Sequence, residues 1–128
     1  MADRSRDPII RTVPQPADMN GNGDIFGGWV LSQMDVAGGA LAARVAKGRV
    51  ATVAIAAMTF VQPIKVGDMV SIYGDVKKVG RTSITIDLET IVQRRHEETE
   101  IQVTHGTFVF VAIDEEGRPR AVPAGAAA

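Results

Sequence analysis

The sequence contains no cysteine, no excess of basic residues and no long uninterrupted apolar run. The lack of cysteine excludes disulfide bonds, cysteine-ligated zinc, iron–sulfur clusters and a cysteine nucleophile. With 14 basic and 15 acidic residues the net charge is −1, whereas a nucleic-acid-binding surface needs a concentrated basic excess. The apolar run at residues 50–58 is interrupted by Thr52 and is too short to span a membrane. The first seven residues are polar and contain no apolar signal region, so we expect a cytoplasmic protein without a membrane segment.

The composition is typical of a globular domain. The 128 residues are 45% hydrophobic and 23% charged, which is unlike the composition of disordered chains. A chain of this length is expected to bury about two-thirds of its unfolded surface around one modest core. We therefore expect a single domain over residues 1–128, with a flexible polar leader at 1–8 and a flexible alanine-rich tail at 124–128.

One long helix is predicted after a loop rich in Gly, Asn and Asp at residues 18–28. From Gly28 onward apolar residues recur with helical spacing, and Gly48 is a plausible end of the helix. This apolar stripe consists of Val30, Met34, Ala37, Leu41 and Val45. The pair Gly38-Gly39 weakens the middle of the helix, which suggests that another element packs very close to its backbone.

One strand is predicted before this helix in the sequence, at residues 9–13, and four after it, at residues 50–61, 69–77, 83–92 and 101–113. The simplest packing is a strongly curved antiparallel sheet wrapped around one long central helix, an α+β fold. The segment 50–61 is apolar almost throughout, so we expect both of its faces to be covered. Because one helix covers only one face of a sheet, the remaining apolar surface favours a partner, most simply a second copy of the chain.

The start of the predicted helix is a candidate binding site. The familiar motifs of serine hydrolases, zinc proteases and nucleotide-binding proteins are absent. His96 and His105 have no further ligand at metal spacing, so we expect no metal site. Gly27 and Gly28 precede the helix, where backbone N–H groups lack intrahelical partners and the positive dipole end can hold an anion or a polarised carbonyl oxygen. A glycine-assisted helix start without a binding role is the alternative.

Two polar side chains extend this candidate site. Asp35 follows Gly28 by seven residues, on nearly the same side of the helix and about 10 Å further along. A mid-helix aspartate among apolar residues is costly to bury, so Asp35 is either a general base or nucleophile in a cleft, or a partly exposed and satisfied carboxylate. Asn20 either forms an Asx turn or orients a water or a carbonyl. The pattern does not choose between Asn20 and its neighbours Asp18, Asn22 and Asp24.

Basic and hydroxyl side chains cluster in the turn between the strands at 69–77 and 83–92. This turn is either a solvated surface or a phosphate-binding site, the latter formed by Lys78, Gly80, Arg81, Thr82 and Ser83. Weaker candidates for the same role are Arg94, Arg95, Arg118 and Arg120. The aromatic residues beside the glycine pair, Phe26 and Trp29, are expected to pack in the core.

Residues 17–35 read ADMNGNGDIFGGWVLSQMD, and this run resembles the signature of YciA-type acyl-CoA thioesterases. The resemblance extends over nearly the whole chain, from about residue 9 to residue 123. Shorter matching segments are Gly48-Arg49-Val50, Met58-Thr59-Phe60, Pro63, Val66-Gly67-Asp68, Lys78-Val79-Gly80-Arg81 and Gly117-Arg118-Pro119-Arg120.

The resemblance implies a hotdog fold, and a dimer with one continuous sheet that commonly assembles into a trimer of dimers. It implies hydrolysis of acyl-CoA without a cofactor, since coenzyme A is part of the substrate. The family's catalytic aspartate corresponds to Asp35 and its asparagine to Asn20, and in the family's dimer these two come from opposite subunits. The backbone N–H of Gly28 would stabilise the oxyanion, and the coenzyme A phosphates would lie against the basic turn at residues 80–83.

The chain departs from its relatives at Gly21, where they often have Ala, and at Ala56, where they often have an acidic residue. An acyl-CoA-binding or regulatory module without turnover is the first alternative, although a binder has no need of Asp35. A hotdog hydratase is the second, but it would require a histidine near the helix start, where neither His96 nor His105 lies. The sequence does not determine the acyl chain length, the physiological substrate, feedback by coenzyme A, or whether Asp35 acts as base or nucleophile.

Overall fold

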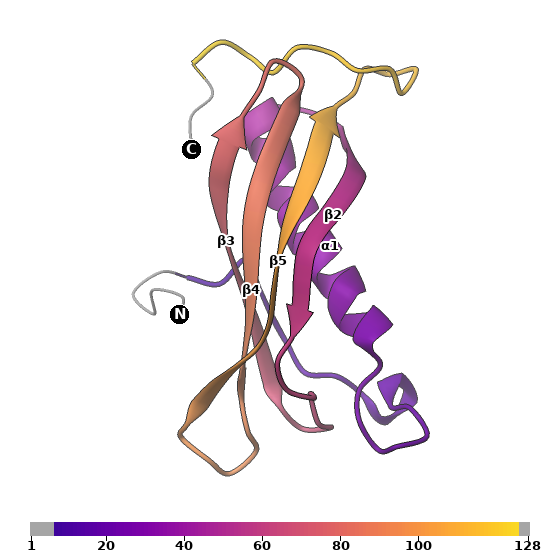
Figure 1. Ribbon diagram of the computed structural model, residues 1–128, viewed down its shortest axis with the longest axis vertical. Coiled ribbons are helices and arrows are strands. Elements are labelled where there is room, and N and C mark those ends of the chain that lie inside the picture. The colour runs from indigo at the N-terminus through magenta and orange to yellow at the C-terminus, as the bar shows by residue number, and fades with distance from the viewer. Residues whose placement is uncertain (1–6, 126–128) are drawn as a thin grey trace.

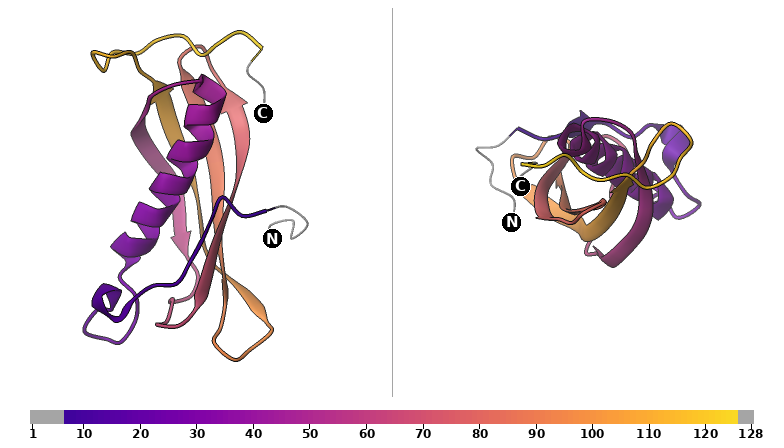
Figure 2. Two further views of the ribbon diagram at one scale, coloured as in Figure 1. Left: turned by 180° about the vertical axis from the view of Figure 1, so that it is seen from behind. Right: turned by 90° about the horizontal axis from the view of Figure 1, so that it is seen from above.

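The computed structural model describes residues 7–125, which form one helix packed against a curved sheet (Figure 1). The elements in chain order are β1 (Ile10–Thr12), the short 3-10 helix η1 (Pro16–Asp18), α1 (Gly27–Ala46), β2 (Val50–Phe60), β3 (Met69–Val79), β4 (Ser83–Gln93) and β5 (Glu100–Ala112). The five strands form a single antiparallel sheet in the order β1-β3-β4-β5-β2. Seen end-on in Figure 2, the sheet curves around α1. The predicted α+β fold, with a curved sheet around one helix, is therefore confirmed.

The predicted flexible ends fall largely on residues outside the described range. Residues 1–6 and 126–128 are not described, so the expectation for 1–8 and 124–128 stays a prediction.

The apolar stripe of α1 faces the sheet as predicted. Val30, Met34 and Ala37 are buried, and Leu41 and Val45 are partly buried against the same core. On the sheet side the core is built by alternate residues of β4 and β5, among them Ile84, Ile86, Leu88, Phe108 and Phe110. The period of 3.6 in the helix and of 2 in the strands therefore places every second strand residue opposite the helix stripe.

The end of α1 differs in detail from the prediction. The left-handed residue that stops the helix is Lys47, with φ 53°, and not Gly48. Gly48 is needed for another reason, since a Cβ there would lie 2.5 Å from Nη2 of Arg120. This guanidinium donates hydrogen bonds to the carbonyl oxygens of Ala46 (2.9 Å) and Ile113 (3.1 Å). Arg120 therefore caps the carboxyl end of α1, where a positive charge is favourable.

Strand β2 lies at the edge of the sheet and is largely exposed in the isolated chain. The expectation that both faces of residues 50–61 are covered is therefore wrong for a single chain: Val53, Ile55 and Phe60 are 55%, 41% and 54% exposed. The strand pairs only with β5 among the described strands, and its register shifts twice, between Thr52 and Ala54 and between Ala56 and Thr59. Its apolar composition thus indicates a surface that another chain can cover, as the sequence also suggested.

The close approach predicted at Gly38-Gly39 is confirmed at Gly38. A Cβ at Gly38 would lie 2.9 Å from Leu88 Cδ1 and 2.9 Å from Phe110 Cζ, whereas one at Gly39 would meet only Phe110 Cε2 at 3.7 Å. The first spacing is a steric conflict and the second is an ordinary van der Waals contact. The missing Cβ of Gly38 therefore sets how closely α1 packs on β4 and β5.

These two glycines form a matched pair for a stability test. Gly38→Ala is expected to lower the free energy of unfolding by about 1–2 kcal/mol, because overpacking outweighs the gain in helix propensity. Gly39→Ala is expected to be neutral or to raise it by up to about 1 kcal/mol. Denaturant unfolding of both variants at one protein concentration measures the difference, and equal stabilities would contradict the packing argument.

Candidate functional site

The amino end of α1 keeps its backbone N–H groups available. Phe26 occupies the N-cap position without a side-chain cap, and the first turn contains no acidic residue. Within residues 7–125 the N–H groups of Gly27 and Gly28 donate no hydrogen bond. These groups and the positive end of the helix dipole together form a place where a negative charge is stabilised. The structure thus agrees with the geometry expected for Gly27 and Gly28.

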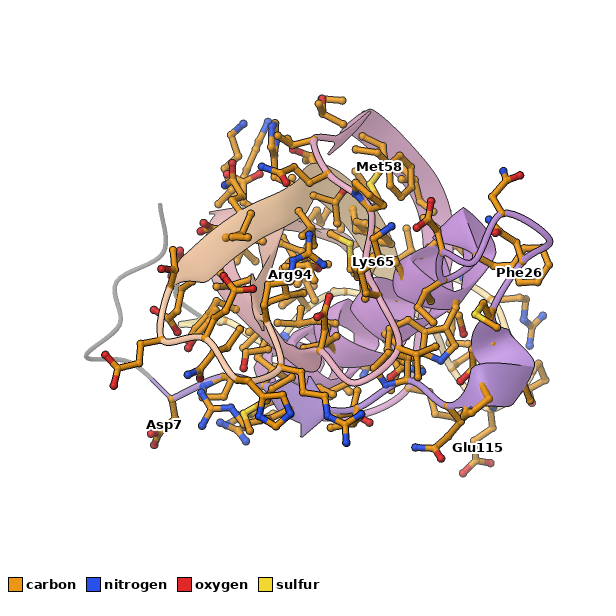
Figure 3. All side chains as sticks on the ribbon, turned by 90° about the horizontal axis from the view of Figure 1, so that it is seen from below. Asp7, Phe26, Met58, Lys65, Arg94 and Glu115 are labelled. Atoms are coloured by element: carbon orange, nitrogen blue, oxygen red, sulfur yellow. The ribbon has the colours of Figure 1, made fainter. Side chains whose placement is uncertain are left out.

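The aromatic residues that flank this helix start behave differently from each other. Trp29 packs against the core as predicted. Phe26 is 53% exposed and lies at the rim of the molecule (Figure 3), so its predicted core role is wrong. The N-cap position accounts for this, since it lies at the transition from loop to helix, outside the apolar stripe of α1.

Asn20 forms an Asx-type turn in the loop before α1. Its Oδ1 accepts hydrogen bonds from the N–H groups of Asn22 (2.8 Å) and Asp24 (3.2 Å), and its own N–H donates to the carbonyl of Asp24 (2.7 Å). The side-chain oxygen is therefore engaged in shaping the loop. Within the described chain, the side-chain NH2 of Asn20 has no hydrogen-bond acceptor, so it is the group able to bind a ligand.

Asn20 and Gly27 line the same cavity. This open cavity of about 310 Å³ is bordered by the helix start, the preceding loop and the end of β2, with Phe60 and Gln62 among its lining residues. A second, apolar cavity of about 40 Å³ adjoins Gly27 beside Ile25, Val30 and Ile64. The phenyl ring of Phe60 lies 3.7 Å from the position of a Gly27 Cβ, so the end of β2 packs against the start of α1.

Asp35 lies apart from that cavity, in the middle of α1. Its carboxylate is half-buried and accepts a hydrogen bond from Thr52 Oγ1 at 2.6 Å. Thr52 is near the start of β2, whereas the cavity is near its end. Along α1, Asp35 follows Gly27 by eight residues, which is about 12 Å at the usual rise of a helix. One chain therefore brings Asn20 and Gly27 together but keeps Asp35 separate, near the opposite end of the exposed edge strand.

The basic turn between β3 and β4 lies at the end of the molecule opposite the start of α1 (Figure 1). Lys78 and Arg81 are exposed there. The N–H of Gly80 donates to the carbonyl of Ser83, and a Cβ at Gly80 would lie 2.6 Å from Ser83 Oγ, a hydroxyl that can rotate away. The carbonyls of Arg81 and Thr82 accept hydrogen bonds from Val122 and Ala112. The positive side chains thus face solvent from a rigid turn next to the start of β2.

Three of the four weaker arginine candidates are engaged in other contacts, whereas Arg95 is exposed. Arg94 donates to Asp68 Oδ2 (2.5 Å) and to the carbonyl of Pro63 (3.0 Å), and Arg118 pairs with Asp114 and Glu116. Arg120 caps α1, as described above. For these residues the predicted phosphate role competes with a structural one.

Two contacts of the site were not anticipated from the sequence. In the sequence Thr52 is only the interruption of an apolar run, yet its hydroxyl binds Asp35. Asp24 was one of several similar side chains in its loop, but in the structure it forms an ion pair with Lys65 of the β2–β3 loop. An isolated hydroxyl in an apolar strand is the one sequence signal that could have pointed to Thr52.

In the described part of the chain, no group of three His, Asp or Glu residues is arranged to hold a metal ion. Among the same residues no helix is both long and apolar enough to cross a bilayer.

The sequence and the fold of this chain are similar to those of known thioesterases. The thioesterase superfamily matches residues 22–99. The acyl-CoA thioester hydrolase YciA of Escherichia coli is 46% identical over 120 residues, which cover 91% of each chain. A hexameric thioesterase of Yersinia pestis superposes with a TM-score of 0.89 at 44% identity and covers 93% of this chain and 97% of its own. A hexameric broad-specificity acyl-coenzyme A thioesterase superposes with a TM-score of 0.87 at 48% identity, covering 93% and 82%.

Proposed function

The chain belongs to the thioesterase superfamily, and we propose that, as an acyl-CoA thioesterase, it hydrolyses acyl-CoA to coenzyme A and a carboxylic acid at a site shared by two subunits. The observation that carries the proposal is the position of Asp35 and of the helix start near opposite ends of one exposed edge strand.

Antiparallel pairing of two β2 strands across a two-fold axis supports a shared site. Such pairing places the start of one β2 beside the end of the other, because the axis passes through the middle of the strand. Asp35 and Thr52 of one subunit would then face Asn20 and Gly28 of the partner subunit. The exposed Val53 and Ile55 would be covered by the same contact. The structural relatives named above are hexamers, and we propose the same assembly here, a trimer of dimers.

The chemistry of the proposed site follows from its groups. The thioester carbonyl oxygen would lie against the N–H of Gly28, where the developing oxyanion is stabilised. Asp35 would take a proton from water as the water oxygen attacks the carbonyl carbon, or would itself attack to form an anhydride that water then hydrolyses. The C–S bond breaks, and coenzyme A leaves as a thiolate that takes up a proton.

Asn20 and Thr52 would orient the reacting groups. Because Oδ1 of Asn20 is held by the loop, its NH2 group is the part that would donate to the substrate carbonyl or to the water. The hydroxyl of Thr52 binds Oδ1 of Asp35 and would leave Oδ2 directed at the water. These are fixed dipoles and need little reorganisation during the reaction.

The coenzyme A phosphates would lie against the β3–β4 turn. Lys78 and Arg81 supply positive charge, and the hydroxyls of Thr82 and Ser83 are additional donors. The turn lies beside the start of β2, since Ala112 pairs with Val50 and donates to the carbonyl of Thr82. In the proposed dimer this is the end at which the helix start of the partner subunit would lie.

Release of free thiol from a panel of short to long acyl-CoA esters tests the activity and its chain-length preference together. The parent protein is expected to turn over, and Asp35→Asn is expected to lose at least about 100-fold in kcat with its circular dichroism unchanged. A parent that binds coenzyme A but releases no thiol would make the chain a binding module instead. Full activity of Asp35→Asn would remove Asp35 from the mechanism but keep the enzyme.

The role of Thr52 is tested by a pair of substitutions. Thr52→Val keeps the shape but lacks the hydroxyl, so kcat is expected to fall about tenfold as Asp35 loses its orienting donor. Thr52→Ser keeps the hydroxyl and is expected to retain most of the activity. Steady-state kinetics of both variants decide the matter, because equal losses would indicate packing and not the hydrogen bond.

Subunit complementation tests whether the site is shared. Asp35→Asn and Asn20→Ala are each expected to be nearly inactive, but a mixed dimer contains one site with both native residues. Random pairing of co-expressed subunits therefore restores about a quarter of the parent activity. No recovery in mixed dimers isolated with two affinity tags would place both residues in a site within one chain.

A further inference from the structure

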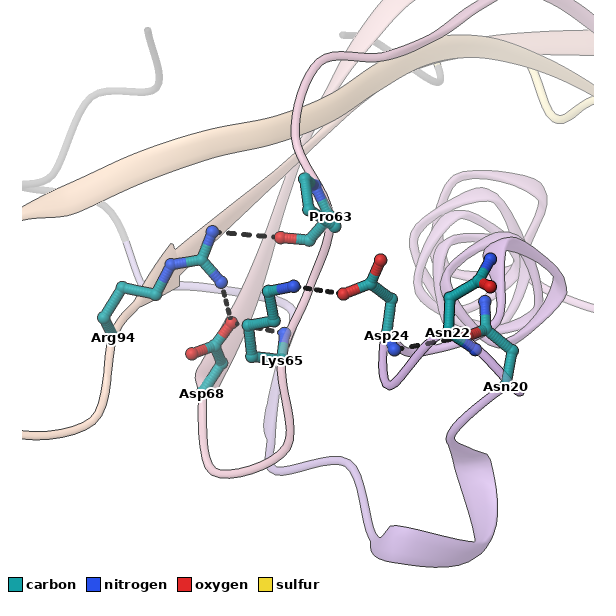
Figure 4. A network of polar contacts seen from close by, with 7 residues as sticks. All are labelled: Asn20, Asn22, Asp24, Pro63, Lys65, Asp68 and Arg94. Atoms are coloured by element: carbon teal, nitrogen blue, oxygen red, sulfur yellow. Dashed lines mark hydrogen bonds and ion pairs between the residues drawn. The ribbon is translucent and has the colours of Figure 1, made fainter.

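Three loops meet at the amino end of α1 and are joined by polar contacts (Figure 4). Asp68, in the β2–β3 loop, is 1% exposed and accepts hydrogen bonds from Arg94 Nη1 (2.5 Å) and from the N–H of Lys65 (2.8 Å). Arg94, in the β4–β5 loop, also donates to the carbonyl of Pro63 (3.0 Å). The buried carboxylate and the guanidinium therefore fix the β2–β3 loop, and with it the backbone of Lys65.

The fixed loop in turn holds the loop before α1 at two adjacent positions. Lys65 Nζ forms an ion pair with Asp24 Oδ1, and the N–H of Ile25 donates to the carbonyl of Ile64 at 2.9 Å. Ile25 and Ile64 are 5% and 2% exposed, so the second link is buried. Asp24 is thus held from one side by the ammonium group of Lys65.

Asp24, together with the N–H of Asn22, also holds Asn20. Its carbonyl accepts the N–H of Asn20 at 2.7 Å, and its own N–H donates to Asn20 Oδ1 at 3.2 Å. Gly27 follows only three residues later and begins α1. A shift of Asp24 would therefore move both the side chain of Asn20 and the N–H groups at the helix start.

We propose that Lys65 is a positioning residue for thioester hydrolysis: its ion pair with Asp24 sets the place of Asn20 and of the helix N–H groups. The inference rests on the proposed function, because it assumes that these groups act on the substrate. Lys65 does not line the cavity that contains Asn20 and Gly27, so it acts through Asp24 and not by touching the substrate.

The solvent exposure of the Lys65–Asp24 ion pair allows a positioning role to be distinguished from a role in stability. The side chains of Lys65 and Asp24 are 50% and 28% exposed. Ion pairs this open to solvent contribute little to global stability, and removing the lysine leaves no buried cavity. The effect of its loss is therefore expected in the geometry of the site and not in the unfolding temperature.

The first test compares Lys65→Met with Lys65→Arg and with the control Lys47→Met. Lys47 is an exposed lysine at the other end of α1 and has no role in the proposed site. Lys65→Met is expected to lower kcat for acyl-CoA about tenfold or more, because small displacements of reacting groups are costly. KM and Tm are expected to stay near the parent values. Lys65→Arg is expected to restore most of kcat, and Lys47→Met to match the parent.

A charge exchange makes the test specific for the ion pair. Lys65→Asp places two carboxylates side by side and is expected to lower kcat further than Lys65→Met. Adding Asp24→Lys to it is expected to recover much of the loss. Failure of the exchanged pair to recover kcat, together with a loss in Lys65→Arg, would overturn the role of the ion pair.

Hydrogen exchange gives a readout that does not depend on activity. Amides in residues 18–28 are expected to exchange faster in Lys65→Met than in the parent or in Lys47→Met, with the core strands unchanged. If the parent protein releases no thiol, the proposed function fails, and this measurement still reports whether Lys65 holds the loop. If the parent is active, and Lys65→Met has both the parent's kcat and its exchange rates, the inference is wrong.

Discussion

A single helix has to cover a sheet that is wider than the helix itself. Five strands at about 4.8 Å spacing span about 20 Å, whereas a helix with its side chains is about 10 Å across. Curvature of the sheet closes part of this gap, and the glycine at position 38 allows α1 to sit deep in the concave face. The edge strand β2 nevertheless remains exposed, with apolar side chains that one chain does not bury. The proposed assembly and the proposed shared site both follow from the exposed apolar surface of this edge strand.

The carboxyl end of α1 is capped by a side chain and the amino end is not, and this difference suits the proposed chemistry. At the carboxyl end Arg120 binds the carbonyl of Ala46, in a space that exists because residue 48 is glycine. At the amino end Phe26 supplies no cap, and the first turn has no acidic residue. The capped carboxyl end stabilises the helix. The uncapped amino end keeps N–H groups that can donate hydrogen bonds to a developing oxyanion. The surrounding loops are held in place by ion pairs that leave those N–H groups accessible.

Much of the fold was predictable, because it depends on local periodicity. The stripe from Val30 to Val45 identified α1 to within about one residue at its start, and the alternation of Ile84, Ile86 and Leu88 identified the inner face of β4. The bounds of β2 were predicted to within one residue, but the expectation that both of its faces are covered failed, because the described chain leaves Val53, Ile55 and Phe60 exposed. The sequence pattern of an apolar strand is the same whether the strand is buried in the core of its own chain or by another subunit.

The sequence by itself determined the α+β architecture, the family resemblance, and the candidates Asn20, Gly28 and Asp35. These signals lie in residues that are close together along the chain, such as the run at residues 17–35. Only the tertiary structure decided that Thr52 binds Asp35, that Lys65 binds Asp24, and that Arg94 forms an ion pair with Asp68. These pairs join residues 17, 41 and 26 positions apart. Their meeting depends on strand register and loop geometry, which arise from the packing of the whole chain and not from any local pattern.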